Sequence, residues 1–90
     1  MAEVSIEYPQ EGEAVSHPTY TFQIQVAEGA RHVRLSIDGG PWLACRESLG
    51  LWWFDWHGYG PGEHEARARI EKPGEFVMHS DLRRFRVDWG

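Results

Sequence analysis

Residues 19–26 read TYTFQIQV and alternate apolar and polar side chains from end to end. The even-numbered positions are apolar or aromatic: Tyr20, Phe22, Ile24 and Val26. The odd-numbered positions are threonines and glutamines. Because successive side chains of a β-strand point to opposite faces, this period of two predicts a strand with one buried face and one face in water. It is the clearest element in the chain.

The same period recurs elsewhere, in pieces too short for typical helices. Five prolines and ten glycines divide the sequence, and the helical period of 3.6 finds almost no match between them. Alternating pieces occupy residues 4–8, 33–37, 42–46, 51–57, 63–70 and 85–89. With residues 19–26 they make about seven strands. This pattern favours an all-β fold, a two-sheet antiparallel sandwich of the immunoglobulin-like or fibronectin-like kind.

The chain's size makes aromatic side chains the main source of a core. Ninety residues form a single domain, residues 1–90, that buries only about two-thirds of its unfolded surface. Five tryptophans, three tyrosines and four phenylalanines supply the bulk. We expect seven of these rings in the core: Tyr20, Phe22, Trp52, Phe54, Trp56, Phe85 and Trp89. Trp42, Trp53 and Tyr59 form a smaller set that is free for other roles.

Charge and cysteine content narrow the function classes. Nine basic and fourteen acidic residues leave a formal charge of −5, which argues against general binding of nucleic-acid phosphates. The single cysteine, Cys45, cannot form an internal disulfide. There is no apolar run long enough for a membrane span and no signal region, so we expect a cytoplasmic protein if the chain is complete. Excision from a longer secreted protein would leave its location open.

Three stretches resemble a known family. They are VRLSIDGGPW at residues 33–42, WWFDW at 52–56 and PGEHEARAR at 61–69. This pattern resembles bacterial immunoglobulin-like (early-set E) domains, familiar from the dimerisation domain of the sulfite oxidase family and from standalone modules. The resemblance covers roughly residues 18–72 and departs after Arg69, where Ile70-Glu71-Lys72 replaces the more usual residues. It implies a role in binding or assembly, with no catalytic residue and no cofactor.

The sequence gives less support to two other hypotheses, metal binding and nucleophilic catalysis. The side chains that could bind zinc or copper lack the spacing of a tight site. His57 and His64 flank a glycine-rich loop and could face each other across a hairpin, which keeps a small metal-binding protein as an alternative. Cys45 paired with a histidine could act as a nucleophile, but a lone strand cysteine is more often a small buried hydrophobe. The candidate ligands are His17, His32, His57, His64, His79 and Cys45.

Outward arginines give a better candidate surface. Arg67 and Arg69 share one face of their strand, and Arg84 and Arg86 share one face of theirs. If the last two strands pair, these four side chains form a basic ladder on one outer sheet face. Either interleaved acids compensate it or an anionic partner covers it. The acidic N-terminal half of a second copy is one such partner.

The remaining rings suggest a second surface. Trp53 is expected to point outward, Trp42 to be partly exposed at the start of a strand, and Tyr59 to lie in a nearby loop. The leading hypothesis is a non-enzymatic module that binds a protein partner or self-associates, through the Trp53 face or the arginine face. Carbohydrate binding by Trp42, Trp53 and Tyr59 is the alternative.

Overall fold

The computed structural model describes residues 3–72, 74 and 76–89, and these residues form strands and turns without a helix. Period-two segments become strands because alternation lets each bury one face. The strands of this described part are β1 (Val4–Tyr8), β2 (Ala14–Val15), β3 (Thr19–Val26), β4 (Arg31–Ile37), β5 (Leu43–Ala44), β6 (Arg46–Ser48), β7 (Leu51–His57), β8 (Gly62–Lys72), β9 (Phe76–His79) and β10 (Arg83–Val87).

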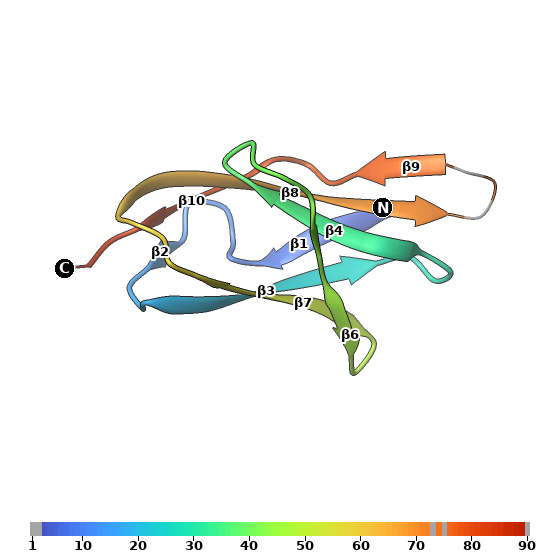
Figure 1. The fold of residues 1–90 in the computed structure, drawn as a ribbon, viewed down its shortest axis with the longest axis horizontal. Helices are drawn as coiled ribbons and strands as arrows, with labels where there is room; N and C mark the ends of the chain where they lie inside the picture. Colours follow the sequence, from blue (N-terminus) through green and yellow to red (C-terminus); the bar gives the residue numbers. More distant parts are fainter. Residues whose placement is uncertain (1–2, 73, 75, 90) are drawn as a thin grey trace.

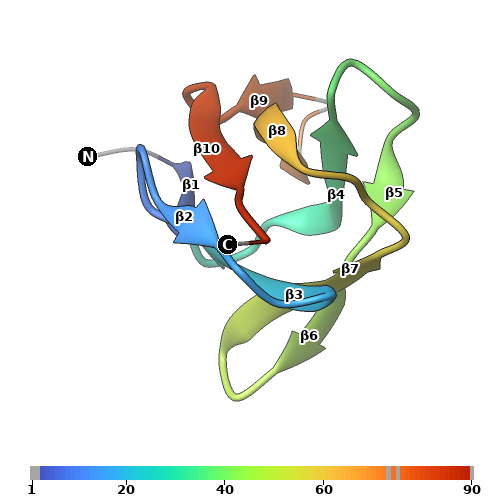
Figure 2. The same cartoon turned by 90° about the vertical axis from the view of Figure 1, so that its left-hand side faces the viewer.

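The strands form two packed sheets (Figure 1). The smaller sheet has the order β1-β3-β7-β6, and the larger has the order β2-β10-β8-β4-β5 with β9 also paired to β8. Figure 2 looks along the long axis, with β3 and β7 in the lower layer and β10, β8 and β4 in the upper. The predicted all-β, two-sheet sandwich is confirmed.

Three details of the expected sandwich differ. The strand predicted at residues 42–46 is wrong as a single element: β5 pairs with β4 in the larger sheet, and β6 pairs with β7 in the smaller one. Two short strands, β2 and β9, had no prediction. The pairing of β2 with β10 is parallel, whereas every pair was expected to be antiparallel. Alternation reports a strand's two faces, but it does not report which sheet the strand joins.

The core lies between the sheets where the alternating faces meet. Phe22 and Ile24 of β3 are fully buried, and so are Ala68 of β8 and Phe85 of β10. The Phe22 ring meets the Phe85 ring edge to face, with the two centroids 5.6 Å apart. Because the β8 side chains facing these rings are small, the two sheets can approach closely.

The predicted aromatic core is confirmed except at Trp89. Phe22 and Phe85 are buried, while Tyr20, Trp52, Phe54 and Trp56 are half-buried and pack against the core. Trp89 is 46% exposed, so its assignment to the core is wrong. β10 ends at Val87, and the alternation therefore does not carry the last ring inward. Trp89 instead stacks on Tyr59, with centroids 5.7 Å apart.

A tight turn joins β4 to the chain that leads into β5. Asp38 and Gly39 both have positive φ, 54° and 71°, and the Gly40 amide donates a hydrogen bond to the Ile37 carbonyl at 3.0 Å. Positive φ at both central residues is the signature of a mirror-image hairpin turn, which Asp-Gly accommodates. The sequence Asp38-Gly39 suits this turn, which reverses the chain so that Trp42 leads into β5 beside β4.

Candidate protein-docking face

The outer face of the larger sheet gathers five of the seven side chains singled out in the sequence. Ala66 and Ala68 point into the core, which leaves Arg67 and Arg69 of β8 on the outside. Phe85 and Val87 of β10 are buried likewise, so Arg84 and Arg86, which alternate with them, point outward. We call this surface, made by Trp42, Arg67, Arg69, Arg84 and Arg86, the arginine face.

One half of the arginine face is balanced by acids. β10 pairs with β8 antiparallel, as the ladder hypothesis required. In that register Arg84 lies opposite Glu65 and Arg86 lies opposite Glu63. Opposite charges across antiparallel strands stabilise the sheet, whereas like charges would weaken it. The β10 arginines therefore have counter-charges in their own sheet.

The other half is not balanced. Arg67 lies opposite Ser36, and Arg69 lies opposite Arg34. Glu71 is engaged with Arg34, whose guanidinium Nη1 lies 3.0 Å from the Glu71 Oε2. Within the described part of the chain, none of the four arginines of this face has a carboxylate in ion-pair contact. The two halves therefore differ in what lies opposite: an acid for each β10 arginine, and no acid for Arg67 or Arg69.

Trp42 holds Arg69 in place. The Arg69 guanidinium carbon lies 4.7 Å from the centroid of the Trp42 ring, within the range of a cation–π interaction. The His79 ring lies on the same indole, with centroids 5.6 Å apart. The Arg69 Nε is buried and finds no hydrogen-bond acceptor among the described residues. The Arg69 side chain is therefore ordered by its contact with Trp42 and does not depend on a bound anion for its position.

A small cavity opens beside this stack. It has a volume of about 170 Å³ and lies between Trp42, Arg67 and Ser36, with Leu82 on its wall. Its lining combines an aromatic ring, an aliphatic side chain and a guanidinium with one acid, Glu65. Such a pocket can receive one apolar side chain of a partner while Arg67 meets a neighbouring acid.

The other predicted rings lie on different surfaces. Trp53 sits on the outer face of the smaller sheet, opposite Gln23 and Arg46, and its Nε1 donates to the Ser48 carbonyl at 2.9 Å. Tyr59 lies between Trp56 and Trp89 in a stack of three rings. Trp42, Trp53 and Tyr59 therefore do not form one platform.

The predicted approach of His57 to His64 is wrong. β7 belongs to the smaller sheet and β8 to the larger, so the loop between them crosses the sandwich and is not a hairpin. His57 is exposed beside Thr19, whereas His64 contacts the rings of Trp56 and Phe85. The described residues contain no group of three or more histidine, cysteine or acidic side chains that could hold a metal ion.

Cys45 is a poor nucleophile in this fold. Burial raises the pKa of its thiol to about 12. Since the thiolate is the reactive form, almost none is present at neutral pH. Cys45 is a partly buried side chain between β5 and β6 that packs against the core.

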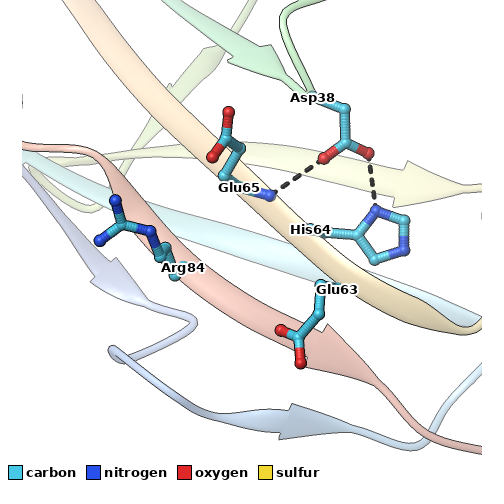
Figure 3. Close-up of a pocket in the computed structure, with 5 residues that line it drawn as sticks. All are labelled: Asp38, Glu63, His64, Glu65 and Arg84. Atoms are coloured by element: carbon cyan, nitrogen blue, oxygen red, sulfur yellow. Dashed lines mark hydrogen bonds and ion pairs between the residues drawn. The ribbon is translucent and has the colours of Figure 1, made fainter.

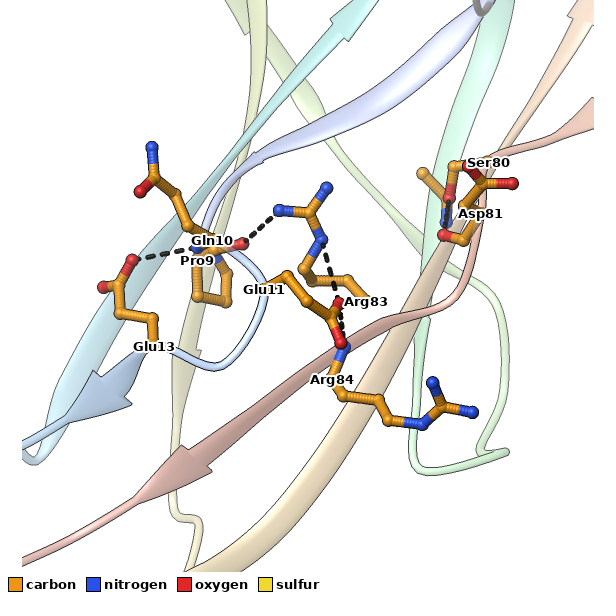
Figure 4. A network of polar contacts seen from close by, with 9 residues as sticks. Pro9, Gln10, Glu11, Glu13, Ser80, Asp81, Arg83 and Arg84 are labelled. Carbon is orange, nitrogen blue, oxygen red and sulfur yellow. Dashed lines mark hydrogen bonds and ion pairs between the residues drawn. The ribbon is translucent and has the colours of Figure 1, made fainter.

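A polar network joins β10 to the segment between β1 and β2 (Figure 4), and the sequence did not predict it. The Arg83 Nη1 donates to the Pro9 carbonyl at 3.2 Å, and the Arg84 amide donates to the Glu11 carboxylate at 3.0 Å. The Gly12 amide returns a bond to the Arg84 carbonyl at 2.8 Å. These residues lie more than seventy positions apart, so no local pattern could have signalled the contact. The network holds the balanced half of the arginine face in register.

Comparisons with known proteins support the fold. No protein-family model matches the chain, and no curated protein matches it. Among solved structures, it is similar to the fibronectin(III)-like modules of CbhA from Clostridium thermocellum, with a TM-score of 0.80, 14% sequence identity and 97% of each chain covered. This similarity confirms an immunoglobulin- or fibronectin-like sandwich. The closer resemblance to the sulfite oxidase dimerisation domain stays a prediction. Among the residues described, no helix is long and apolar enough to cross a membrane.

Proposed function

We propose that this chain is a non-catalytic docking module that binds an acidic segment of another protein through Trp42, Arg67 and Arg69. Fibronectin(III)-like folds commonly mediate interactions without catalysing reactions. The observation that carries the proposal is that, among the described residues, no acid lies opposite Arg67 or Arg69 on the arginine face of a chain whose formal charge is −5.

Charge complementarity identifies the partner's chemistry. Arg67 and Arg69 are two residues apart on one strand, so their side chains leave the sheet about 7 Å apart. An extended segment with acids at alternate positions has the same spacing. Each acid can then meet one guanidinium, as charged surfaces in protein complexes commonly do.

Hot-spot composition supports the same surface. Interfaces concentrate their binding energy in tryptophan, tyrosine and arginine near the centre of the contact. Here a tryptophan and two arginines lie together beside a cavity of about 170 Å³. Because Arg69 is already packed on Trp42, little side-chain entropy remains to be lost when a partner binds.

Fluorescence anisotropy tests the proposal with a labelled peptide of alternating glutamate and leucine, and with its lysine and leucine counterpart. We expect the acidic peptide to bind and the basic one not to bind. Arg67→Gln should weaken binding about tenfold, since a hydrogen bond to a charged group contributes about 1.5 kcal/mol or more.

Arg86→Gln is the matched control. It removes the same charge from the balanced half of the same face, where Glu63 lies opposite. We expect an effect of about twofold or less there, the size typical of a charge at the rim of an interface. Equal losses of peptide affinity for Arg67→Gln and Arg86→Gln would contradict the assignment of Arg67 to the centre of the binding site. Self-association in sedimentation, with no peptide binding, would identify a second copy as the occupant instead.

A further inference from the structure

His64 makes two contacts that a neutral imidazole cannot both satisfy, and Figure 3 shows the one with Asp38. Its Nδ1 lies 2.6 Å from the Asp38 Oδ2, and its Nε2 lies 2.9 Å from the Gly60 carbonyl oxygen. A carbonyl and an ionised carboxylate only accept hydrogen bonds, and a neutral imidazole carries one N–H. Both bonds therefore require the imidazolium, in which both ring nitrogens donate.

The surroundings of His64 identify the group that holds its charge. Its side chain is 13% exposed, with the Trp56 ring at its edge and the Phe85 ring stacked on it. Asp38, from the turn after β4, is the one carboxylate in contact with the imidazole among the residues described. Other charged residues of its own strand and of β10 lie nearby: Glu63, Glu65 and Arg84 line one pocket with His64 and Asp38, and Arg86 lies opposite Glu63.

The two contacts join segments from different parts of the sandwich. Gly60 belongs to the loop between β7 and β8, which also carries Tyr59 in its stack between Trp56 and Trp89. Asp38 begins the turn after β4, and its second oxygen accepts a hydrogen bond from the Glu65 amide at 3.0 Å. His64 thus ties the loop that crosses between the sheets to a turn of the larger sheet.

We propose that His64 is a pH-dependent clamp that tightens the loop at residues 58–61 when protonated and loosens it when neutral. The proposal goes beyond the docking function and does not depend on it. On deprotonation the remaining proton stays on Nδ1, because a carboxylate is a stronger acceptor than a carbonyl. The contact with Gly60 is then lost, and the loop keeps the contacts of Tyr59 alone: its stack on Trp56 and the hydrogen bond that its hydroxyl donates to the His17 carbonyl.

The direction of the pH effect follows from the contacts. Burial opposes the charge, but the hydrogen bonds to Asp38 and Gly60, together with the negative charges of Asp38 and Glu63, outweigh it and raise the pKa of His64 above its ordinary value. A raised pKa in the folded state stabilises the fold fully below the unfolded pKa, about 6.5. That contribution is lost as the pH rises through the folded pKa of His64.

Thermal unfolding at a series of pH values tests the clamp. We expect the wild-type melting temperature to fall by about 5 °C as the pH rises through the folded pKa of His64, a shift of the size that one lost contact gives in a domain this small. Asp38→Asn should move the fall to lower pH, because the carboxylate is gone. His57→Gln is the control, since His57 is exposed on the other sheet, and it should leave the profile unchanged.

A second measurement keeps the proposal testable if a variant does not fold. In the wild-type protein, the ring ¹⁵N resonances of His64 should show both nitrogens protonated at pH 6 and Nδ1 alone protonated above the transition. The amides at residues 58–61 should exchange faster with solvent in the neutral form. A single protonated nitrogen at pH 6, or unchanged exchange across the transition, would overturn the clamp.

Discussion

At the scale of single residues, burial separates side chains that the sequence cannot separate. Phe22 and Phe76 are chemically the same residue, and both belong to strands. Phe22 has no exposed surface and meets the rings of Tyr20, Trp56 and Phe85, while Phe76 is 67% exposed. The two rings therefore make a matched pair for measuring what burial contributes to this core.

We expect Phe22→Ala to lower the free energy of unfolding by about 3–5 kcal/mol, because it leaves a cavity among packed rings. Phe76→Ala should change it by about 0.5 kcal/mol or less, as surface substitutions usually do. Urea denaturation followed by tryptophan fluorescence measures both values. Losses of similar size at the two positions would mean that the core does not centre on Phe22.

At the scale of elements, the sequence predicts strands well where one face is buried along the whole strand. Residues 19–26 are β3, with bounds that match the alternation. β8 extends past the predicted stretch to Lys72, because its partner changes from β10 to β9 along its length. β2, β5 and β6 are only two or three residues long. The partner of such a short strand depends on which segments lie next to it in space, and the alternation of its own side chains does not predict that partner.

The sequence likewise predicts one part of the candidate docking face and not another. Alternation predicted that Arg67 and Arg69 share a face, and that Arg84 and Arg86 share one. It could not predict that Glu65 would lie opposite Arg84 while Arg34 would lie opposite Arg69. That difference depends on strand register, which is fixed by the packing of the buried faces. The register therefore identifies Arg67 and Arg69, out of the four predicted arginines, as the two with no acid opposite them.

β9 is the edge strand with the most exposed apolar surface. Phe76 is 67% exposed and Val77 is 51% exposed. Within the described residues β9 pairs with β8 alone, so its outer edge offers unpaired backbone groups. An apolar open edge promotes pairing with other chains, and a lysine on it is a common protection.

We expect Val77→Lys to slow aggregation on mild heating, measured by light scattering below the melting temperature. Leu49→Lys is the control, since Leu49 is 92% exposed but lies in the turn between β6 and β7. It adds the same charge without touching an apolar edge. Equal protection by both lysines would assign the effect to net charge and not to β9.

At the scale of the whole molecule, charge is distributed unevenly. The chain carries a formal charge of −5, yet arginines outnumber acids on the outer face of the larger sheet. An acidic partner is therefore repelled by the molecule at a distance and attracted by Arg67 and Arg69 at contact. The two effects have different ranges, and salt screens the longer one first.

This difference predicts a maximum in affinity as ionic strength increases. At about 0.01 M salt the Debye length is roughly 30 Å, and the net negative charge opposes an acidic peptide. At about 0.15 M it is roughly 8 Å, so the repulsion is screened while contacts at Arg67 and Arg69 persist. At about 1 M the contacts are screened as well. Anisotropy titrations of the glutamate and leucine peptide across this range should show the tightest binding at intermediate salt. Steadily weaker binding from the lowest salt upward would mean that the local arginine charge, and not the net charge, governs approach at every distance.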